Sequence, residues 1–254
     1  MLVAKPTKPQ LSTIRSAQHD RSESDVRLIV QSDGFCANSW EAAYLRFQTP
    51  AQEMLKFVKR LMKVGAARWP RNAEIVEVFC GRGNGLHALS NLGFTRLEGV
   101  DLSASLLAEY RGPAKLYVCD CRQLRFDDCS KDIVIIQGGL HHLQSLPDDL
   151  EQTLSEANRV LREGGLLVLV EPWLTPFLSF VHAVCRRSLA RRISKKVNAL
   201  ATMIYYEGKT YEQWLHQPQV IWHLLQKYFR PERHKVCWGK IMFVGRKRAE
   251  FVDC

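Results

Sequence analysis

Short apolar runs alternate with stretches of helical spacing between residues 75 and 171. This alternation predicts parallel strands joined by helices. The predicted strands are residues 75–80, 96–100, 116–119, 133–136 and 166–170. The predicted helices between them are residues 85–92, 104–110 and 148–161. Right-handed crossovers between such elements give a doubly wound sheet.

The flanking segments have a different pattern. Apolar positions at helical spacing over residues 40–62 predict two helices that Pro50 divides. Helical patterns also run through residues 173–204 and 211–228, and a Trp238-Gly239 turn near the end predicts a β-hairpin. The expected fold is therefore α/β: a Rossmann-like, doubly wound, mostly parallel sheet with a terminal antiparallel hairpin and an inserted helical lid.

The same patterns divide the 254 residues into parts. We expect a flexible N-terminal tail (1–33), a Rossmann-like cofactor domain (34–171), a basic helical lid (172–230) and a terminal hairpin completing the sheet (231–254).

Charge separates the lid and hairpin from the rest of the chain. The net charge is +10, and residues 172–254 hold 15 Lys and Arg against 5 Asp and Glu. Such asymmetry predicts an anionic partner for this part, with solubility as the alternative. An apolar position recurs every four residues in the lid, at Phe177, Val181, Cys185, Leu189, Ile193 and Val197.

That spacing predicts one amphipathic helix with a cationic opposite face, able to make peripheral contact with an anionic membrane. The alternative is a lid helix packed on the sheet with a solvated basic face. No apolar run approaches the ~20 residues that span a bilayer, and no targeting segment is evident. We therefore expect a cytoplasmic protein.

The eight cysteines are scattered, without a C-x-x-C pair. We expect them to be reduced and to pack as small apolar side chains, including Cys119, Cys121 and Cys129, which lie close in sequence. No metal site is predicted.

A glycine-rich segment, VEVFCGRGNG, lies where the first predicted strand turns into a helix (residues 76–85). Glycine there lets a ligand approach the backbone, and the helix N-terminus offers unpaired N–H groups. A tight turn without a ligand is the alternative. Asp101 and Asp120 end the next two strands, so two carboxylates share one rim of the sheet with the glycines.

These motifs resemble the class I S-adenosylmethionine-dependent methyltransferases, particularly small-molecule enzymes whose fourth strand ends in a His pair, as QGGLHH (137–142) does here. The resemblance covers residues 39–171 and the hairpin. It implies S-adenosylmethionine as cofactor, with its methionine moiety at residues 77–85, its ribose on Asp101 and its adenine at Asp120 and the N–H of Cys121. It also implies that residues 40–47 fold over the cofactor. The implied binding residues are Glu77, Gly81, Gly83, Gly85, Asp101, Asp120, Cys121 and Gln137.

One position departs from the family pattern, which has glycine where this chain has Phe79. A side chain there could crowd the methionine end of the site or point into the sheet. We expect the second, because the three following glycines are retained.

Methyl transfer needs alignment and, for some acceptors, a base. His141 and His142 follow the fourth strand, and Glu171 ends the fifth, so these are the candidate catalytic residues. The alternatives are histidines that pack or cap a helix, and a carboxylate satisfied by nearby backbone.

The sequence thus predicts methyl transfer to a small, anionic or amphipathic acceptor. The absence of an NPPY-like tetrapeptide and of a Pro-Cys nucleophile argues against nucleic-acid bases as acceptors. The alternatives are a non-catalytic S-adenosylmethionine-binding module or a basic RNA-interacting protein. An NAD-dependent oxidoreductase is a lesser one, because the third glycine of the NAD fingerprint is Leu86.

Overall fold

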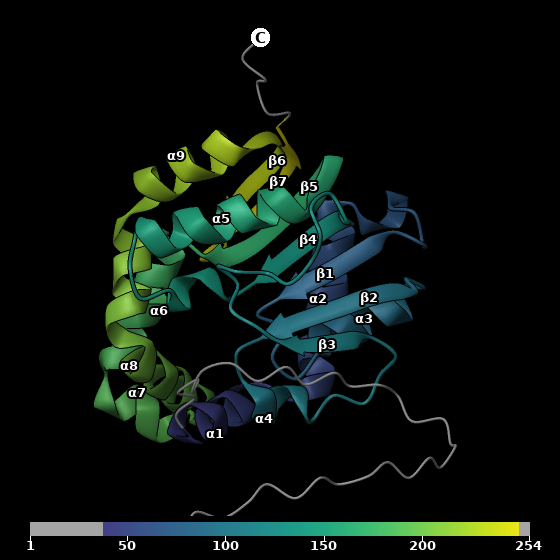
Figure 1. Ribbon diagram of the computed structural model, residues 1–254. Coiled ribbons are helices and arrows are strands. Elements are labelled where there is room, and N and C mark those ends of the chain that lie inside the picture. The colour runs from purple at the N-terminus through teal and green to yellow at the C-terminus, as the bar shows by residue number, and fades with distance from the viewer. Residues whose placement is uncertain (1–37, 249–254) are drawn as a thin grey trace, which may run out of the picture.

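Runs of buried aliphatic residues form a seven-stranded sheet in the computed structural model, which describes residues 38–248 (Figure 1). The strands are β1 (Glu74–Val78), β2 (Arg96–Asp101), β3 (Lys115–Val118), β4 (Lys131–Gln137), β5 (Leu161–Pro172), β6 (Phe229–Cys237) and β7 (Lys240–Lys247). Their order is β3-β2-β1-β4-β5-β7-β6. Strands β1 to β5 are parallel, and β7 runs antiparallel to both β5 and β6.

Helices cover both faces because successive strand residues point to opposite sides. Val134 and Ile136 of β4 pack in one core with α5 and α9, whereas Ile133 and Ile135 pack in the other with α2 and α3. The helices are α1 (Asn38–Phe47), α2 (Pro50–Val64), α3 (Asn84–Asn91), α4 (Ala104–Leu107), α5 (Asp148–Val160), α6 (Pro176–Arg186), α7 (Ser188–Ile193), α8 (Lys195–His216) and α9 (Pro218–Tyr228). Two 3-10 turns are η1 (Ala66–Arg68) and η2 (Leu140–His142).

The predicted fold class is confirmed. Pro50 separates α1 from α2, and the terminal hairpin turns at Trp238 and Gly239, which have positive φ angles of 50° and 72°. Every strand predicted between residues 75 and 170 is present, although β5 begins five residues early at Leu161. The predicted tail (1–33) and residues 249–254 of the predicted hairpin segment lie outside the described residues.

The prediction of one amphipathic helix through the lid is wrong. Arg187 and Ser194 have extended backbone angles and break the segment into α6, α7 and α8. Cys185 is consequently buried, while Leu189 and Ile193 are 66% and 77% exposed. The helix predicted over residues 211–228 is likewise divided, at Pro218. Within residues 38–248, no helix is long and apolar enough to span a membrane.

Candidate active site

The glycine-rich turn carries β1 into α3 at the carboxyl edge of the sheet. Gly81 and Gly83 have φ angles of 52° and 73°, which residues with a Cβ rarely adopt. A Cβ at Gly83 would lie 2.3 Å from the Tyr110 ring, and one at Gly85 would lie 2.0 Å from the Glu77 carboxylate. Close packing therefore requires these last two glycines. Beside Gly81 a Cβ would meet nothing within 4 Å, so a ligand could approach the backbone there.

Phe79 also has a left-handed backbone, with φ of 61°. Its ring lies directly against Gly139, where an added Cβ would be 2.2 Å from the ring's Cγ. The side chain packs on the core shared with α5, as expected, but remains half-buried. The positive φ angle explains why related enzymes have glycine at this position. In this chain Phe79 instead places an aromatic ring between the ends of β1 and β4.

Asp101, at the end of β2, joins that strand to the glycine-rich turn. Its Oδ2 accepts a hydrogen bond from the N–H of Gly81 at 2.8 Å, and its Oδ1 accepts one from Ser103 at 2.9 Å. Burial raises the pKa of Asp101, and these backbone donors oppose the rise. Each oxygen of the carboxylate can accept a further hydrogen bond, so both could accept from ribose hydroxyls. That contact remains a prediction.

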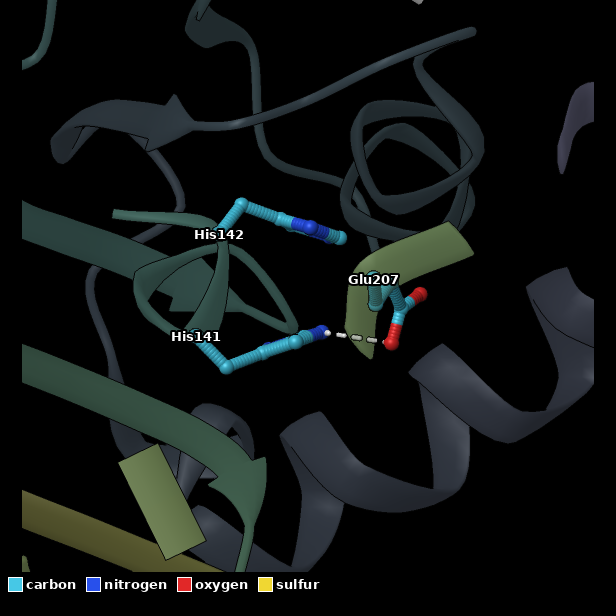
Figure 2. A group of neighbouring side chains, drawn as sticks. All are labelled: His141, His142 and Glu207. Carbon is cyan, nitrogen blue, oxygen red and sulfur yellow. Dashed lines mark ion pairs between the residues drawn. The ribbon is translucent and has the colours of Figure 1, made fainter. Parts of the chain in front are cut away.

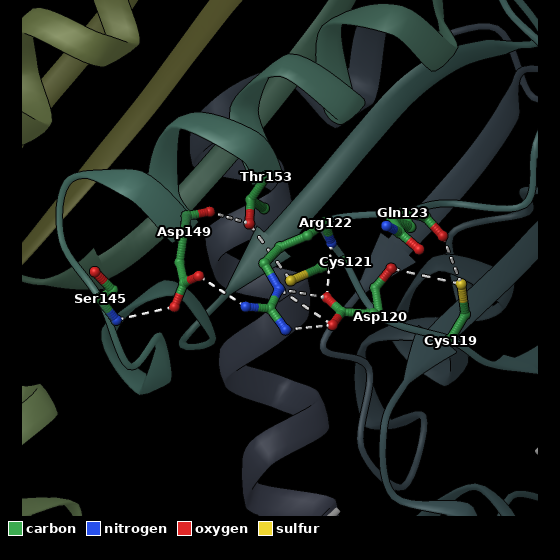
Figure 3. A network of polar contacts seen from close by, with 8 residues as sticks. All are labelled: Cys119, Asp120, Cys121, Arg122, Gln123, Ser145, Asp149 and Thr153. Atoms are coloured by element: carbon green, nitrogen blue, oxygen red, sulfur yellow. Dashed lines mark hydrogen bonds and ion pairs between the residues drawn. The ribbon is translucent and has the colours of Figure 1, made fainter. Parts of the chain in front are cut away.

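Asp120 belongs to a separate polar network (Figure 3). Arg122 donates to both of its oxygens, holds its pKa below the usual range, and also donates to Asp149 at 2.7 Å. The buried thiol of Cys121 lies 3.5 Å from the hydroxyl of Thr153. An adenine amino group bound here would share the Asp120 carboxylate with Arg122, and that contact also remains a prediction.

The cysteines that lie close in sequence have separate partners. Cys119 donates to the carbonyl of Gln123 at 3.1 Å, whereas Cys129 lies 3.6 Å from the ammonium of Lys247. All six cysteines within the described residues are free.

Glu77 and Gln137 bring the ends of β1 and β4 together beneath the glycine-rich turn. Gln137 donates to Glu77 Oε1 at 3.5 Å, but Glu77 Oε2 and Gln137 Oε1 are buried without a hydrogen-bond partner among the described residues. Burial raises the pKa of Glu77 to about 8. A buried acceptor without a hydrogen bond costs free energy. A ligand that donates hydrogen bonds to both oxygens would remove this cost, and a cationic amino group is such a ligand.

His141 is held by Glu171, which is fully buried at the end of β5. Glu171 Oε1 accepts from the N–H groups of Gly139 and Leu140 at 2.7 and 3.0 Å, and its Oε2 lies 2.8 Å from Nδ1 of His141. Because a carboxylate accepts, the ring proton is assigned to Nδ1, which leaves a lone pair on Nε2. Glu171 was one of the candidate catalytic residues. In the structure it contacts the His141 ring and the backbone, and a part in catalysis remains a prediction.

A residue that the sequence analysis missed completes this group. Glu207 of α8 reaches in from the lid, its Oε2 lying 3.7 Å from Nε2 of His141 and its Oε1 accepting from the indole of Trp40 at 2.7 Å (Figure 2). Burial raises its pKa. The neighbouring ring of His142 stacks 4.1 Å from that of His141, and burial lowers its pKa well below the usual value. In the sequence, the glycine that follows Glu207, Gly208, is the signal for the kink of α8 at this point.

Two half-buried cations, Lys240 and Arg60, lie near these carboxylates. Burial lowers the pKa of Lys240, at the start of β7, to about 8, and it lowers the pKa of Arg60 in α2. Both cations are attracted electrostatically by Glu171. No hydrogen bond from either side chain is found within residues 38–248, so an anionic group placed here would gain two partners.

Known proteins with similar sequences are methyltransferases. Residues 76–169 match the family model described as methyltransferase domain. Demethylmenaquinone methyltransferase from Staphylococcus aureus (strain MRSA252) is 36% identical over 121 residues, which cover 44% of this chain and 48% of that protein. The chain thus spans about half the length of the curated relatives it matches.

Solved structures agree on the fold. The PH0226 protein from Pyrococcus horikoshii OT3 superposes with a TM-score of 0.62 at 20% identity, covering 85% of this chain and 100% of that one. Geranyl diphosphate C-methyltransferase from Streptomyces coelicolor A3(2), solved with Mg²⁺, geranyl diphosphate and S-adenosylhomocysteine, gives 0.55 at 13% identity, covering 78% of each chain.

Residues 76–169 are therefore similar to a methyltransferase domain, and the chain has the Rossmann-like fold that the resemblance to S-adenosylmethionine-dependent enzymes implies. The residues present fit this cofactor, because its amino group supplies the donors that Glu77 and Gln137 lack. The structure forms two pairs at the ends of neighbouring strands: Glu77 with Gln137 at β1 and β4, and His141 with Glu171 after β4 and at the end of β5.

Proposed function

We propose that this protein is an enzyme that transfers a methyl group from S-adenosylmethionine to a small-molecule acceptor bound beside His141. The observation that carries the proposal is the His141–Glu171 pair. It follows directly after β4, whose last residue, Gln137, contacts Glu77. A group able to take a proton thus follows four residues after Gln137, which carries one of the orphaned acceptors that fit the cofactor.

In this proposal Glu77 and Gln137 hold the amino group, Asp101 the ribose, and Asp120 with the N–H of Cys121 the adenine. Open space at Gly81 would let the methionine moiety approach the backbone, while Gly83 and Gly85 allow the turn to pack closely on Tyr110 and Glu77. When bound, the cofactor supplies a methyl group activated by attachment to a sulfonium.

His141 is the proposed base, and Glu171 is its positioning residue. The acceptor atom forms a bond to the methyl carbon while the carbon–sulfur bond breaks, and the electron pair of that bond stays on sulfur. The acceptor's proton passes to Nε2 of His141, whose other nitrogen is fixed by Glu171. His142 packs beside this ring, where its contact with Trp40 at 5.9 Å helps to close the site.

An anionic or amphipathic acceptor is supported by two observations. The half-buried cations Lys240 and Arg60 lie close enough to the site to sense the charge of Glu171. The relatives carry names that include a menaquinone precursor and a diphosphate. A negatively charged end on the acceptor would pair with these cations and offset their burial.

The surface of the lid supports the proposed peripheral contact with an anionic membrane. Phe180 and Ile193 of the lid are 65% and 77% exposed, and Trp238, at the hairpin turn, is 75% exposed. Arg191 and Arg192 line a surface hollow in the same region. Exposed apolar groups beside cations are the combination that binds at a lipid interface.

Incubation with S-adenosylmethionine carrying a deuterated methyl group and with fractionated metabolite extracts tests the enzyme activity. Mass spectrometry should detect S-adenosylhomocysteine together with a small molecule about three mass units heavier than its ordinary methylated form, because three deuterium atoms replace three hydrogen atoms. The His141→Asn variant is the matched control for base catalysis. Cofactor binding without S-adenosylhomocysteine in any fraction would favour a non-catalytic module, and a label found only in RNA would favour the RNA alternative.

A further inference from the structure

The side chains of His141, His142 and Glu207 converge on one buried space between the sheet and the lid (Figure 2). One ligand atom from each lies within 4.8 Å of those of the other two. Among residues 38–248, no other group of three His, Cys, Asp or Glu residues meets this spacing. Two of the residues come from η2 and one from α8, so the group joins segments that are 65 positions apart in sequence.

We propose that His141, His142 and Glu207 bind a divalent transition-metal ion of the zinc or iron(II) class. Two imidazoles and a carboxylate are a donor set suited to these ions, whereas Mg²⁺ prefers oxygen ligands throughout. Ligands at about 2.0–2.2 Å from an ion lie about 3.0–3.5 Å from one another. Nε2 of His141 and Oε2 of Glu207 are already 3.7 Å apart, so modest side-chain rotations complete the site.

The hydrogen bonds around the group orient its lone pairs toward the shared space. Glu171 accepts a hydrogen bond from the Nδ1–H of His141, and the indole of Trp40 donates to the far oxygen of Glu207. Two electron-rich atoms, Nε2 and Oε2, are thereby left facing each other in a buried position. A cation placed between them would bind both atoms, and carboxylate–histidine pairs such as Glu171–His141 commonly support bound metals.

Two further features favour a ligand in this space. Neither ring nitrogen of His142 has a hydrogen-bond partner within the described part of the chain. Gly208 interrupts α8 with φ of 26° and ψ of −94°, immediately after Glu207, so the helix is broken where this carboxylate points inward. The ring of Trp40 lies 5.9 Å from that of His142, and the ring of Tyr211 lies 5.7 Å from that of His141, so aromatic side chains flank the space.

The site defines an acceptor class, an inference that rests on the proposed methyl transfer. Three protein ligands leave coordination positions open for an oxygen atom of the acceptor, such as a hydroxyl or enol oxygen. A bound ion would lower the pKa of that oxygen and favour its deprotonated form, with the proton passing to solvent. Because Nε2 of His141 would then hold the ion, this inference keeps the proposed methyl transfer and replaces the role of base proposed for His141.

Metal titrations of the tag-free, chelator-treated full chain test the proposal. Calorimetry should show one equivalent of Zn²⁺ bound about 100-fold more tightly than Mg²⁺. Co²⁺ should give the visible absorption bands of a site with nitrogen ligands. Glu207→Gln and His142→Phe should each weaken Zn²⁺ binding more than about 100-fold, and Trp40→Phe about 10- to 100-fold. The matched control is His223→Asn, which removes a histidine of α9 that lines a different surface hollow and should bind as wild type.

Equal affinity for Zn²⁺ and Mg²⁺ in the wild-type protein would overturn the metal site. Wild-type Zn²⁺ affinity in a folded Glu207→Gln or His142→Phe variant would overturn it as well, and using both protects against failure of one to fold. S-adenosylhomocysteine titrated into the same samples separates the two proposals. Cofactor binding without Zn²⁺ binding refutes only the metal site, and Zn²⁺ binding without cofactor binding refutes only the methyl transfer.

Discussion

Replacing Phe79 by glycine and by alanine separates the two contributions of this residue. The backbone at residue 79 is left-handed, with φ of 61°, which costs a residue with a Cβ about 1–2 kcal/mol. The ring compensates by packing against Gly139 and the core shared with α5. Alanine removes the ring and keeps the strain, whereas glycine removes both.

The expected magnitudes follow from burial. Truncating a fully buried Phe to Ala costs about 3–5 kcal/mol, so the half-buried ring of Phe79 should contribute about 1.5–2.5 kcal/mol. Phe79→Ala should lower the free energy of unfolding by that amount. Phe79→Gly should be about 1 kcal/mol more stable than Phe79→Ala, because it also relieves the strain. At an ordinary position glycine is instead the less stable of the two, by roughly 0.5–1 kcal/mol.

Urea denaturation monitored by circular dichroism measures both differences, and calorimetry with S-adenosylhomocysteine measures cofactor affinity. We expect affinity to change little, because the ring lies against Gly139 and the core. An alanine variant as stable as the glycine variant would refute the strain argument. A sharp gain in affinity with unchanged stability would instead place the ring in the cofactor site.

Other predictions concern protons and the lid. Because burial raises the pKa of Glu77 to about 8, Glu77 is protonated in the free protein at pH 6.5. A bound ammonium favours the carboxylate, so cofactor binding should release about one proton and tighten as the pH rises toward 8. Calorimetry in buffers of different ionisation enthalpy measures this release, which Glu77→Gln should abolish. His141→Asn should slow turnover about 10²- to 10⁴-fold without loosening the cofactor. The protein should co-sediment with anionic but not neutral vesicles at low salt, with each cation contributing about 1 kcal/mol. Neutralising six lid cations should abolish this co-sedimentation: Arg186, Arg187, Arg191, Arg192, Lys195 and Lys196.

Three results would contradict these expectations. Absence of proton release at pH 6.5 would mean that Glu77 is already ionised or does not meet the amino group. A His141→Asn variant with the wild-type rate across pH 6–9 would show that alignment alone suffices and that the histidine is structural. Equal sedimentation with both kinds of vesicle, or with neither, would mean that the lid cations attract a soluble anionic substrate or are solvated surface residues without a binding role.

The sheet could be predicted from sequence because its signals are local. Runs such as Ile133–Ile136 are buried on both faces, and the glycine-rich turn marks the first strand-to-helix junction. The lid could not be predicted in the same way. Arg187 and Ser194 interrupt its helices without the proline or glycine that normally marks a break. The apolar periodicity therefore continues through both helix breaks, and so it predicted one helix where the structure has three.

The candidate site shows the same limit. His141 and Glu171 were found because both follow predicted strands, and strand ends converge on one rim. Glu207 was missed because its contact with His141 depends on how α8 folds back over the sheet, and sequence spacing carries no record of that. Asp120 was identified by position, but its pairing with Arg122 and Asp149 depends on the placement of α5.

Calorimetric titration of S-adenosylhomocysteine into the wild-type protein and into Asp101→Ala tests the central claim most directly. The claim is that the glycine-rich turn and the carboxylates at neighbouring strand ends form the cofactor site. It predicts saturable binding at one equivalent, weakened about 10- to 150-fold in the variant, because hydrogen bonds to a charged group contribute ~1.5–3 kcal/mol. Absence of binding to the wild-type protein, or unchanged affinity in a folded Asp101→Ala, would contradict it.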